Sequence, residues 1–213
     1  MKWSLDKLTG LISGMELDNE MEKMIAGGNE FALVFMDIDT LMAINDGFGV
    51  EAGDEVFRLI AREIKKIFPE PCLAFRGTRD HFSIIVPGGG KEEAFLKTEE
   101  LRKAVNDTKL DFTSKSGEPL RQSVSAGVSS CPDDGNRPAD IKRRADSAMA
   151  RAKKSGRNMV CLAREEKLLP KTSHYTQAQL EKLTHISESE GVGEAVLLRE
   201  ALDDLLKKYD VDR

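Results

Sequence analysis

Two acidic residues, Asp37 and Asp39, stand at the end of an apolar run that begins at Phe31. A short run rich in Val, Phe and Leu is typical of a strand buried on both faces, so both carboxylates are expected at the strand tip. Carboxylate oxygens are the ligands that a hard cation such as Mg²⁺ prefers. A glycine-punctuated loop and a helix pattern at residues 53–68 follow. This order of features indicates a segment that presents acidic groups to a metal ion and a nucleotide.

Strand and helix patterns alternate along the chain before residue 163. Strands are expected at residues 31–36, 74–76, 82–86 and 122–129. Helices are expected at residues 53–68, from near residue 91, and at residues 138–154. A turn at residues 77–80 separates the second strand from the third and should form the tip of a hairpin. This order predicts an α/β fold, with a mixed sheet flanked by helices on both sides.

Further motifs stand in a fixed order along the chain. They are D-K-L-T-G-L at residues 6–11, Asp37-Ile38-Asp39, Asn45-Asp46 with Gly49, Gly53-Asp54, A-D-S-A-M at residues 145–149 and A-K-K-S-G-R-N at residues 152–158. Together they resemble the GGDEF family of diguanylate cyclases over about residues 5–162. The resemblance implies a palm-like mixed sheet of the nucleotide-cyclase kind, flanked by helices.

The family's signature is altered in this chain. The family reads R-Y-G-G-D-E-F where residues 76–82 read R-G-T-R-D-H-F. The resemblance implies a metal site at Asp37 and at the position of His81, but a neutral imidazole is a poor ligand for Mg²⁺. Thr78 and Arg79 replace two flexible glycines, and Met42 replaces a phosphate-contacting lysine. We therefore predict no catalytic residues and no diguanylate cyclase activity.

Other family positions for nucleotide binding are kept. The resemblance implies that Asn45 and Asp54 hydrogen-bond guanine and that Lys153 and Arg157 contact phosphates. Arg79 could replace the positive charge of the missing metal. The predicted site for GTP or cyclic di-GMP is thus Asn45, Asp54, Asp37, Arg79, Lys153 and Arg157. The structural alternative for these residues is a turn, a helix start and a solvated helix end.

We expect no required cofactor at this site. Mg²⁺ could accompany the nucleotide, and its ligands would then stand at Asp37 and Ile38. The family's inhibitory R-x-x-D motif, which binds the product, falls at Pro69 and Cys72. Neither residue matches that motif, so cyclic di-GMP is expected to use the degenerate active-site cleft.

The C-terminal segment has two helix patterns of its own, at residues 177–189 and 193–209. It resembles the ribbon-helix-helix repressors of the CopG and Arc kind, which are obligate dimers whose paired strands enter the DNA major groove. The corresponding strand here would be residues 171–175, with Thr172 and His174 facing the bases. Residues 166–213 carry 7 Lys and Arg against 10 Asp and Glu. A negative segment attracts phosphates weakly, so a helical hairpin that only dimerises is the alternative.

Composition excludes membrane and secreted classes. The 213-residue chain has a net charge of −5 at pH 7. No apolar run approaches the ~20 residues that span a bilayer, and the first residues lack the apolar segment of a secretory signal. Cys72, Cys131 and Cys161 show no C-x-x-C spacing and no even pairing. A cytoplasmic protein without a membrane partner is expected.

The whole sequence predicts a GGDEF domain at residues 1–163, a linker at 164–171 and a ribbon-helix-helix domain at 172–213. We expect a homodimeric transcriptional regulator that binds a guanine nucleotide and DNA. One alternative is a residual cyclase in which Asp80 or Asp39 replaces the missing carboxylate. The other is a scaffold that binds neither ligand and is dimerised by its C-terminal helices.

Overall fold

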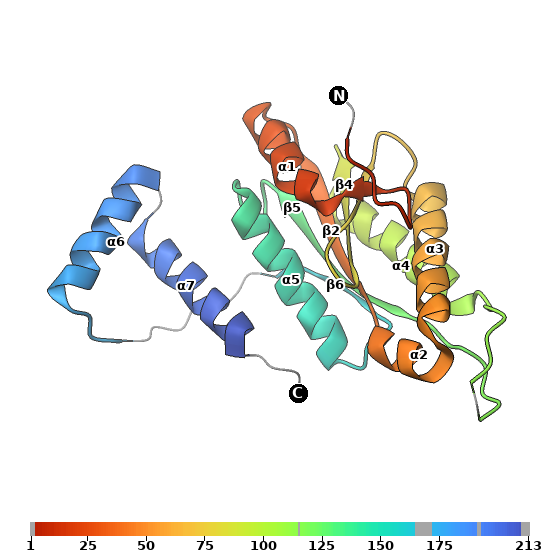
Figure 1. The fold of residues 1–213 in the computed structure, drawn as a ribbon. Coiled ribbons are helices and arrows are strands. Elements are labelled where there is room, and N and C mark those ends of the chain that lie inside the picture. Colours follow the sequence, from red (N-terminus) through yellow and green to blue (C-terminus); the bar gives the residue numbers. More distant parts are fainter. Residues whose placement is uncertain (1–2, 115, 165–171, 191–192, 210–213) are drawn as a thin grey trace. The chain divides into compact units, whose positions relative to one another are not determined.

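The computed structural model describes residues 3–114, 116–164, 172–190 and 193–209 (Figure 1). The chain divides into two compact units, Met1–Glu166 and Lys167–Arg213. Most of the predicted linker, residues 165–171, lies outside the described residues. Each unit is therefore considered by itself.

The described residues of the first unit form a six-stranded mixed sheet in the order β1-β3-β4-β2-β5-β6. The strands are β1 (Ile12–Ser13), β2 (Phe31–Ile38), β3 (Leu73–Arg76), β4 (His81–Pro87), β5 (Val124–Cys131) and β6 (Val160–Leu162). Strand β2 is antiparallel to both β4 and β5, whereas β1 is parallel to β3 and β6 is parallel to β5. The expected mixed sheet is confirmed, and β2 lies inside it.

Helices cover both faces of this sheet (Figure 1). They are α1 (Leu17–Ala26), α2 (Leu41–Phe48), α3 (Val50–Ile67), α4 (Lys91–Asp107) and α5 (Pro138–Lys154), with a short 3₁₀ turn at Gly14–Glu16. Side chains alternate along β2, so Ala32, Val34, Met36 and Ile38 join the core with α3 and α4, while Phe31 and Leu33 join the core with α1 and α5. The buried strand predicted from the apolar run is therefore correct.

The sequence predicts a loop directly before the helix at residues 53–68, and this prediction is wrong. Residues 41–48 form α2 instead, and α3 begins at Val50 rather than at residue 53. Ile44 is buried in the core, and the N–H group of Gly49 donates to the carbonyl of Asn45. Gly49 has φ 93°, a conformation that favours glycine, and it separates the two helices. The burial of Ile44 favours a helix despite the neighbouring glycines.

The described residues of the second unit form two helices, α6 (Gln177–Glu190) and α7 (Glu194–Tyr209), as the sequence predicts. The hydroxyl of Thr184 donates to Glu194 over 2.6 Å and joins them. Large apolar side chains of both helices are exposed in the single chain: Leu180, Ile186, Leu198, Leu202, Leu205, Leu206 and Tyr209. None of the helices that the structure describes is long and apolar enough to cross a bilayer.

The contact between β5 and α5 is close enough to test by mutation. A Cβ atom on Gly127 would lie 2.0 Å from the carbonyl oxygen of Ala145 and 2.4 Å from the amide nitrogen of Met149. Backbone atoms cannot yield as a side chain can, so Gly127→Ala should lower the free energy of unfolding by about 3 kcal/mol. Urea denaturation followed by circular dichroism measures it.

The matched control is Gly47→Ala, because a Cβ atom at this α2 glycine would meet nothing within 4 Å. This variant should be neutral or more stable by about 0.5–1 kcal/mol. Equal stabilities of the two variants would contradict the close packing of β5 on α5.

Candidate functional site

The side chain of Asp37 is 2% exposed at the end of β2. Its odd position in the strand directs it to the sheet face that α5 covers, where Lys153 Nζ lies 2.7 Å from Asp37 Oδ2. On the neighbouring strand β4, His81 is the register partner of Asp37, and its Nδ1 atom lies 3.1 Å from the same oxygen. The sheet register and the last turn of α5 thus bring one basic group each to this carboxylate.

Asp39 has different neighbours. Residues two apart on a strand share a face, but β2 ends at Ile38, before Asp39. The buried Asp39 carboxylate accepts hydrogen bonds from the hydroxyls of Ser123 and Ser125, each over 2.7 Å, and from the amide of Asn158 over 2.9 Å. These bonds tie β5 and the turn after α5 to the end of β2. Asp39 is therefore occupied as a structural acceptor and does not join the group around Asp37.

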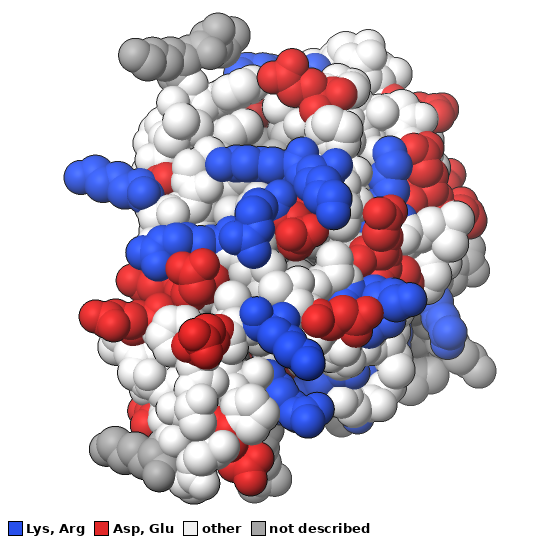
Figure 2. Space-filling view, turned by 90° about the vertical axis from the view of Figure 1, so that its right-hand side faces the viewer, with Lys and Arg blue, Asp and Glu red and all other residues white. Residues whose placement is uncertain are grey.

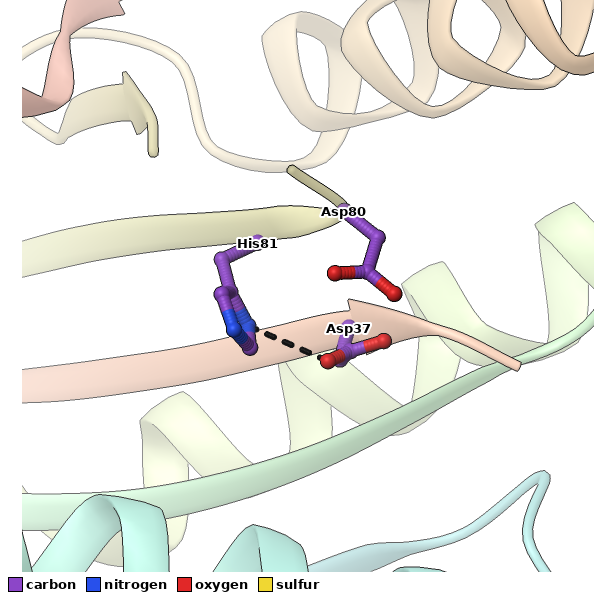
Figure 3. A group of neighbouring side chains, drawn as sticks. All are labelled: Asp37, Asp80 and His81. Atoms are coloured by element: carbon purple, nitrogen blue, oxygen red, sulfur yellow. Dashed lines mark ion pairs between the residues drawn. The ribbon is translucent and has the colours of Figure 1, made fainter. Parts of the chain in front are cut away.

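Asp80 does join that group. Figure 3 shows Asp80, at the hairpin tip, and His81, at the start of β4, near Asp37 on β2. Each residue offers a ligand atom, and these atoms lie within 4.8 Å of one another. The Ile38 side chain is buried in the core, and its N–H group donates to the carbonyl of Asp80.

The charges in this group shift one another's pKa values. Burial by itself would raise the pKa of Asp37, but hydrogen bonds with His81 and Lys153 outweigh it and hold that pKa below its ordinary value. The hydrogen bond with Asp37 raises the pKa of His81 against the effect of burial. Burial and the nearby charge of Asp37 raise the pKa of Asp80. The group is therefore a pair of acids held beside two bases.

The donor set does not match what Mg²⁺ requires. Mg²⁺ takes oxygen ligands in a near-octahedral arrangement. Here an imidazole stands beside Asp37, and one Asp37 oxygen already has two basic partners. The residues present do not fit a magnesium site of the kind that the family resemblance implies.

The residues expected to bind guanine lie on α2 and α3. Asn45 is half-buried on α2, and its Oδ1 atom has no hydrogen-bond partner among the described residues. A Cβ atom at Gly53 would lie 2.1 Å from this oxygen, so any other residue at position 53 would force the Asn45 side chain to move. Asp54 follows Gly53 and is half-buried. Gly53 thus makes room for the Asn45 amide near the Asp54 carboxylate.

The remaining predicted residues are less enclosed. Arg157 and Arg79 are both exposed and both have positive φ angles, 64° and 57°. Asp37 and Lys153 are in direct contact. Among the described residues, no hydrogen bond or ion pair joins Arg79 or Arg157 to either of them. Thr172 and His174 are exposed, and residues 172–176 form neither helix nor strand in the single chain.

Arg76 organises the hairpin tip, and the sequence interpretation missed this role. Its guanidinium lies 4.1 Å from the ring centroid of Phe57 and 5.1 Å from that of Phe82. It also donates to the carbonyls of Gly77, Arg79 and His81. An arginine just before a hairpin turn was the available signal. Its aromatic partner on α3 is distant in sequence and could not be read from the hairpin alone.

A separate cavity of about 760 Å³ lies between the start of α1, α5 and the hairpin. Asp6, Phe35, Arg76, His81, Lys142 and Asp146 are among the residues that line it. It touches His81, but Asn45, Asp54 and Lys153 are not part of its lining. The predicted guanine-binding residues therefore lie outside this cavity.

Comparison with known proteins decides the family. The model of the diguanylate cyclase GGDEF domain matches residues 3–159. The chain belongs to the GGDEF family. A second model, that of a ribbon-helix-helix domain, matches residues 167–210. Both resemblances inferred from the motifs are confirmed, and the second unit is a ribbon-helix-helix domain.

Several relatives share the GGDEF region. The chain is 33% identical over 163 residues to the diguanylate cyclase DgcP of Pseudomonas aeruginosa. The aligned region covers 74% of this chain and 24% of that protein. It is 34% identical over 161 residues to the response regulator PleD of Caulobacter vibrioides. This aligned region covers 73% of the chain and 35% of that protein. The chain therefore spans about a quarter to a third of the length of these relatives.

Solved structures of the family have the same fold. The GGDEF domain of DgcB from Caulobacter crescentus in complex with c-di-GMP aligns with a TM-score of 0.67 at 28% identity. The alignment covers 76% of this chain and 97% of that chain. The palm-like sheet with flanking helices is thus confirmed for the first unit.

The structural role of Asp39 can be separated from the site chemistry. Asp39→Ala would leave two hydroxyls and one amide without their charged acceptor, which should lower the free energy of unfolding by about 3 kcal/mol or more. Asp46→Ala, at an exposed acid of α2, should change it by less than about 0.5 kcal/mol. Urea unfolding of both variants tests this, and a wild-type midpoint for Asp39→Ala would refute the assignment.

Proposed function

We propose that the GGDEF domain of this chain is a receptor for a guanine nucleotide, GTP or cyclic di-GMP, and not a cyclase. The observation that carries the proposal concerns buried oxygens without partners. Among the described residues, three buried side-chain atoms lack a hydrogen bond: Asp37 Oδ1, Asn45 Oδ1 and Gln122 Oε1. Two of them, on Asp37 and Asn45, belong to the predicted nucleotide-binding residues.

An unpaired buried acceptor costs about 1–3 kcal/mol, so the unpaired Asn45 oxygen in the predicted base site favours a ligand that brings a donor. Guanine offers N–H donors on its ring and on its exocyclic amine, which suit the Asn45 amide and the Asp54 carboxylate. Lys153 and Arg157 supply positive charge for phosphates. These residues support retention of the family's nucleotide cleft.

Loss of catalysis is supported by the other half of the site. A cyclase must withdraw charge from a triphosphate with divalent ions. Here His81 replaces an expected carboxylate ligand, and Lys153 with His81 already neutralises Asp37. The glycine positions of the hairpin carry Thr78 and Arg79. The specific observation in favour of residual cyclase activity is Asp80, which lies near Asp37 and could act as a substitute carboxylate.

The ribbon-helix-helix domain is proposed to dimerise the chain and bind DNA in the cytoplasm. The apolar side chains that α6 and α7 expose in the single chain support dimerisation, because a second copy can bury them. Residues 172–175 lie in no helix or strand of the single chain, which leaves them available to pair with the same segment of that copy. Figure 2 shows the face of α3 and α4, where Lys and Arg are interspersed with Asp and Glu. This face offers no continuous positive surface for DNA. The DNA contact is assigned to the paired strands because the ribbon-helix-helix family model matches this unit.

Nucleotide binding can be tested with two site variants and one control. Asn45→Ala and Asp54→Ala should each weaken binding of GTP or cyclic di-GMP at least about tenfold, because each removes a hydrogen bond to the base. Asp46→Ala, at the exposed neighbour of Asn45 on α2, should bind like the wild type. Isothermal titration calorimetry in EDTA and in Mg²⁺ measures this for the full chain.

Three other results would each contradict part of this proposal. Unchanged affinity in Asp54→Ala would refute the placement of the cleft. No binding of either nucleotide by the wild type would refute the receptor and favour the scaffold alternative. Cyclic di-GMP formed from GTP and Mg²⁺ would establish the enzyme instead.

DNA binding can be tested on a duplex selected by the wild-type chain from a randomised library. Thr172→Ala with His174→Ala should weaken binding about tenfold or more, since each base contact contributes about 1–3 kcal/mol, and should leave the dimer intact. Leu202→Asp should produce a monomer that does not bind. Fluorescence anisotropy and sedimentation velocity measure the two effects. His185→Ala, at an exposed histidine of α6, is the control, and failure to enrich any duplex would contradict the proposal.

A further inference from the structure

The acidic group at the end of β2 includes two side chains, Asp80 and His81, that the nucleotide proposal does not use. Asp37 Oδ2 is paired with His81 and Lys153, while Asp37 Oδ1 is buried and has no partner among the described residues. Asp80 brings a second carboxylate to the same place. Two carboxylates beside an unpartnered buried oxygen are costly unless a proton or a cation lies between them.

We propose that Asp37, Asp80 and His81 bind one divalent transition-metal ion, such as Zn²⁺ or Co²⁺, in place of the Mg²⁺ of a cyclase. Imidazole is a preferred ligand for Zn²⁺ and related ions, whereas Mg²⁺ prefers oxygen alone. The substitution that is unfavourable for magnesium therefore selects another class of metal. This inference goes beyond nucleotide binding and does not depend on it.

The geometry is compatible with such a site after small side-chain rotations. The three ligand atoms lie within 4.8 Å of one another. Metal–ligand bonds of about 2.0–2.2 Å place neighbouring ligand atoms about 3–4 Å apart. Asp37 is fixed by burial, but the His81 side chain is 46% exposed and Asp80 lies at the hairpin tip, so both can move the remaining distance. Three protein ligands leave room in the coordination sphere for water or a phosphate oxygen.

Lys153 opposes the metal. Its ammonium group lies 2.7 Å from Asp37 Oδ2 and carries the same sign of charge as the ion. It can withdraw, because its side chain is 35% exposed, but its presence lowers the affinity. Removing the ammonium group by Lys153→Met should therefore tighten metal binding.

The experiment is a titration of the metal-free full chain with CoCl₂ in the absence of nucleotide, followed by visible absorption. We expect one equivalent of Co²⁺ with nitrogen and oxygen ligands, displacement by ZnCl₂, and much weaker competition from MgCl₂. Cys72, Cys131 and Cys161 are not part of the group. A thiolate-to-cobalt absorption band would therefore overturn the proposal.

Variants locate the metal. His81→Ala should weaken Co²⁺ binding by about 100-fold or more, because losing a ligand costs at least as much as losing an outer-shell partner. His81→Glu should restore an oxygen donor and improve Mg²⁺ binding relative to Co²⁺. The control is His185→Ala, which removes an exposed histidine of α6 and should bind as the wild type does.

Several outcomes would contradict the proposed metal site. No Co²⁺ binding by the folded wild type would show that His81 and Lys153 alone neutralise Asp37. Unchanged binding in His81→Ala, or loss of binding in the His185→Ala control, would place the metal elsewhere. Circular dichroism of each variant excludes misfolding as the cause. Because nucleotide binding is measured separately in EDTA, failure of the metal site leaves the receptor proposal standing.

Discussion

Burial of the Asp37 carboxylate constrains the site end of the sheet. A charge at the end of an interior strand loses its hydration, and this loss is tolerable only if basic groups replace water. Two elements distant in sequence supply them, β4 through His81 and the last turn of α5 through Lys153. Helix α5 and the hairpin must therefore both be placed so that Lys153 and His81 reach the same carboxylate.

The hairpin is held from its other side by cation–π and hydrogen-bond contacts of Arg76. Its guanidinium packs on Phe57 of α3 and caps the carbonyls of the turn. The signature segment thus remains ordered even though its glycines are replaced. A hairpin stabilised in this way can keep its shape while the side chains at its tip change, which separates the evolution of the fold from that of the chemistry.

Much of the fold could be predicted because local patterns agree with the packing. The apolar run of β2 and the helical spacing of α5 reflect burial directly, and they match the structure closely. Helix α2 was missed because Gly47 and Gly49 resemble loop residues, while the burial of Ile44 that favours the helix arises only in the folded core.

The site was harder to predict than the elements. The motifs give the candidate residues, but they do not show that Asp37 and Lys153, 116 positions apart, share a hydrogen bond. Nor do they distinguish Asp37 from Asp39, since that difference depends on where β2 ends and which serines β5 presents. The close fit of Gly53 on α3 against the Asn45 amide on α2 is likewise a contact between two helices. Each of these facts is a tertiary contact with no local sequence signal.

The pairing of Lys153 with Asp37 also has a thermodynamic consequence. One ammonium group cannot fully neutralise a buried carboxylate and hold a phosphate at the same moment. If Lys153 turns to a phosphate, the carboxylate must acquire a compensating proton or cation, because an uncompensated buried charge is strongly unfavourable. The occupancy of the phosphate position and the uptake of positive charge at the strand end are then linked equilibria, and each must shift the other by the same free energy.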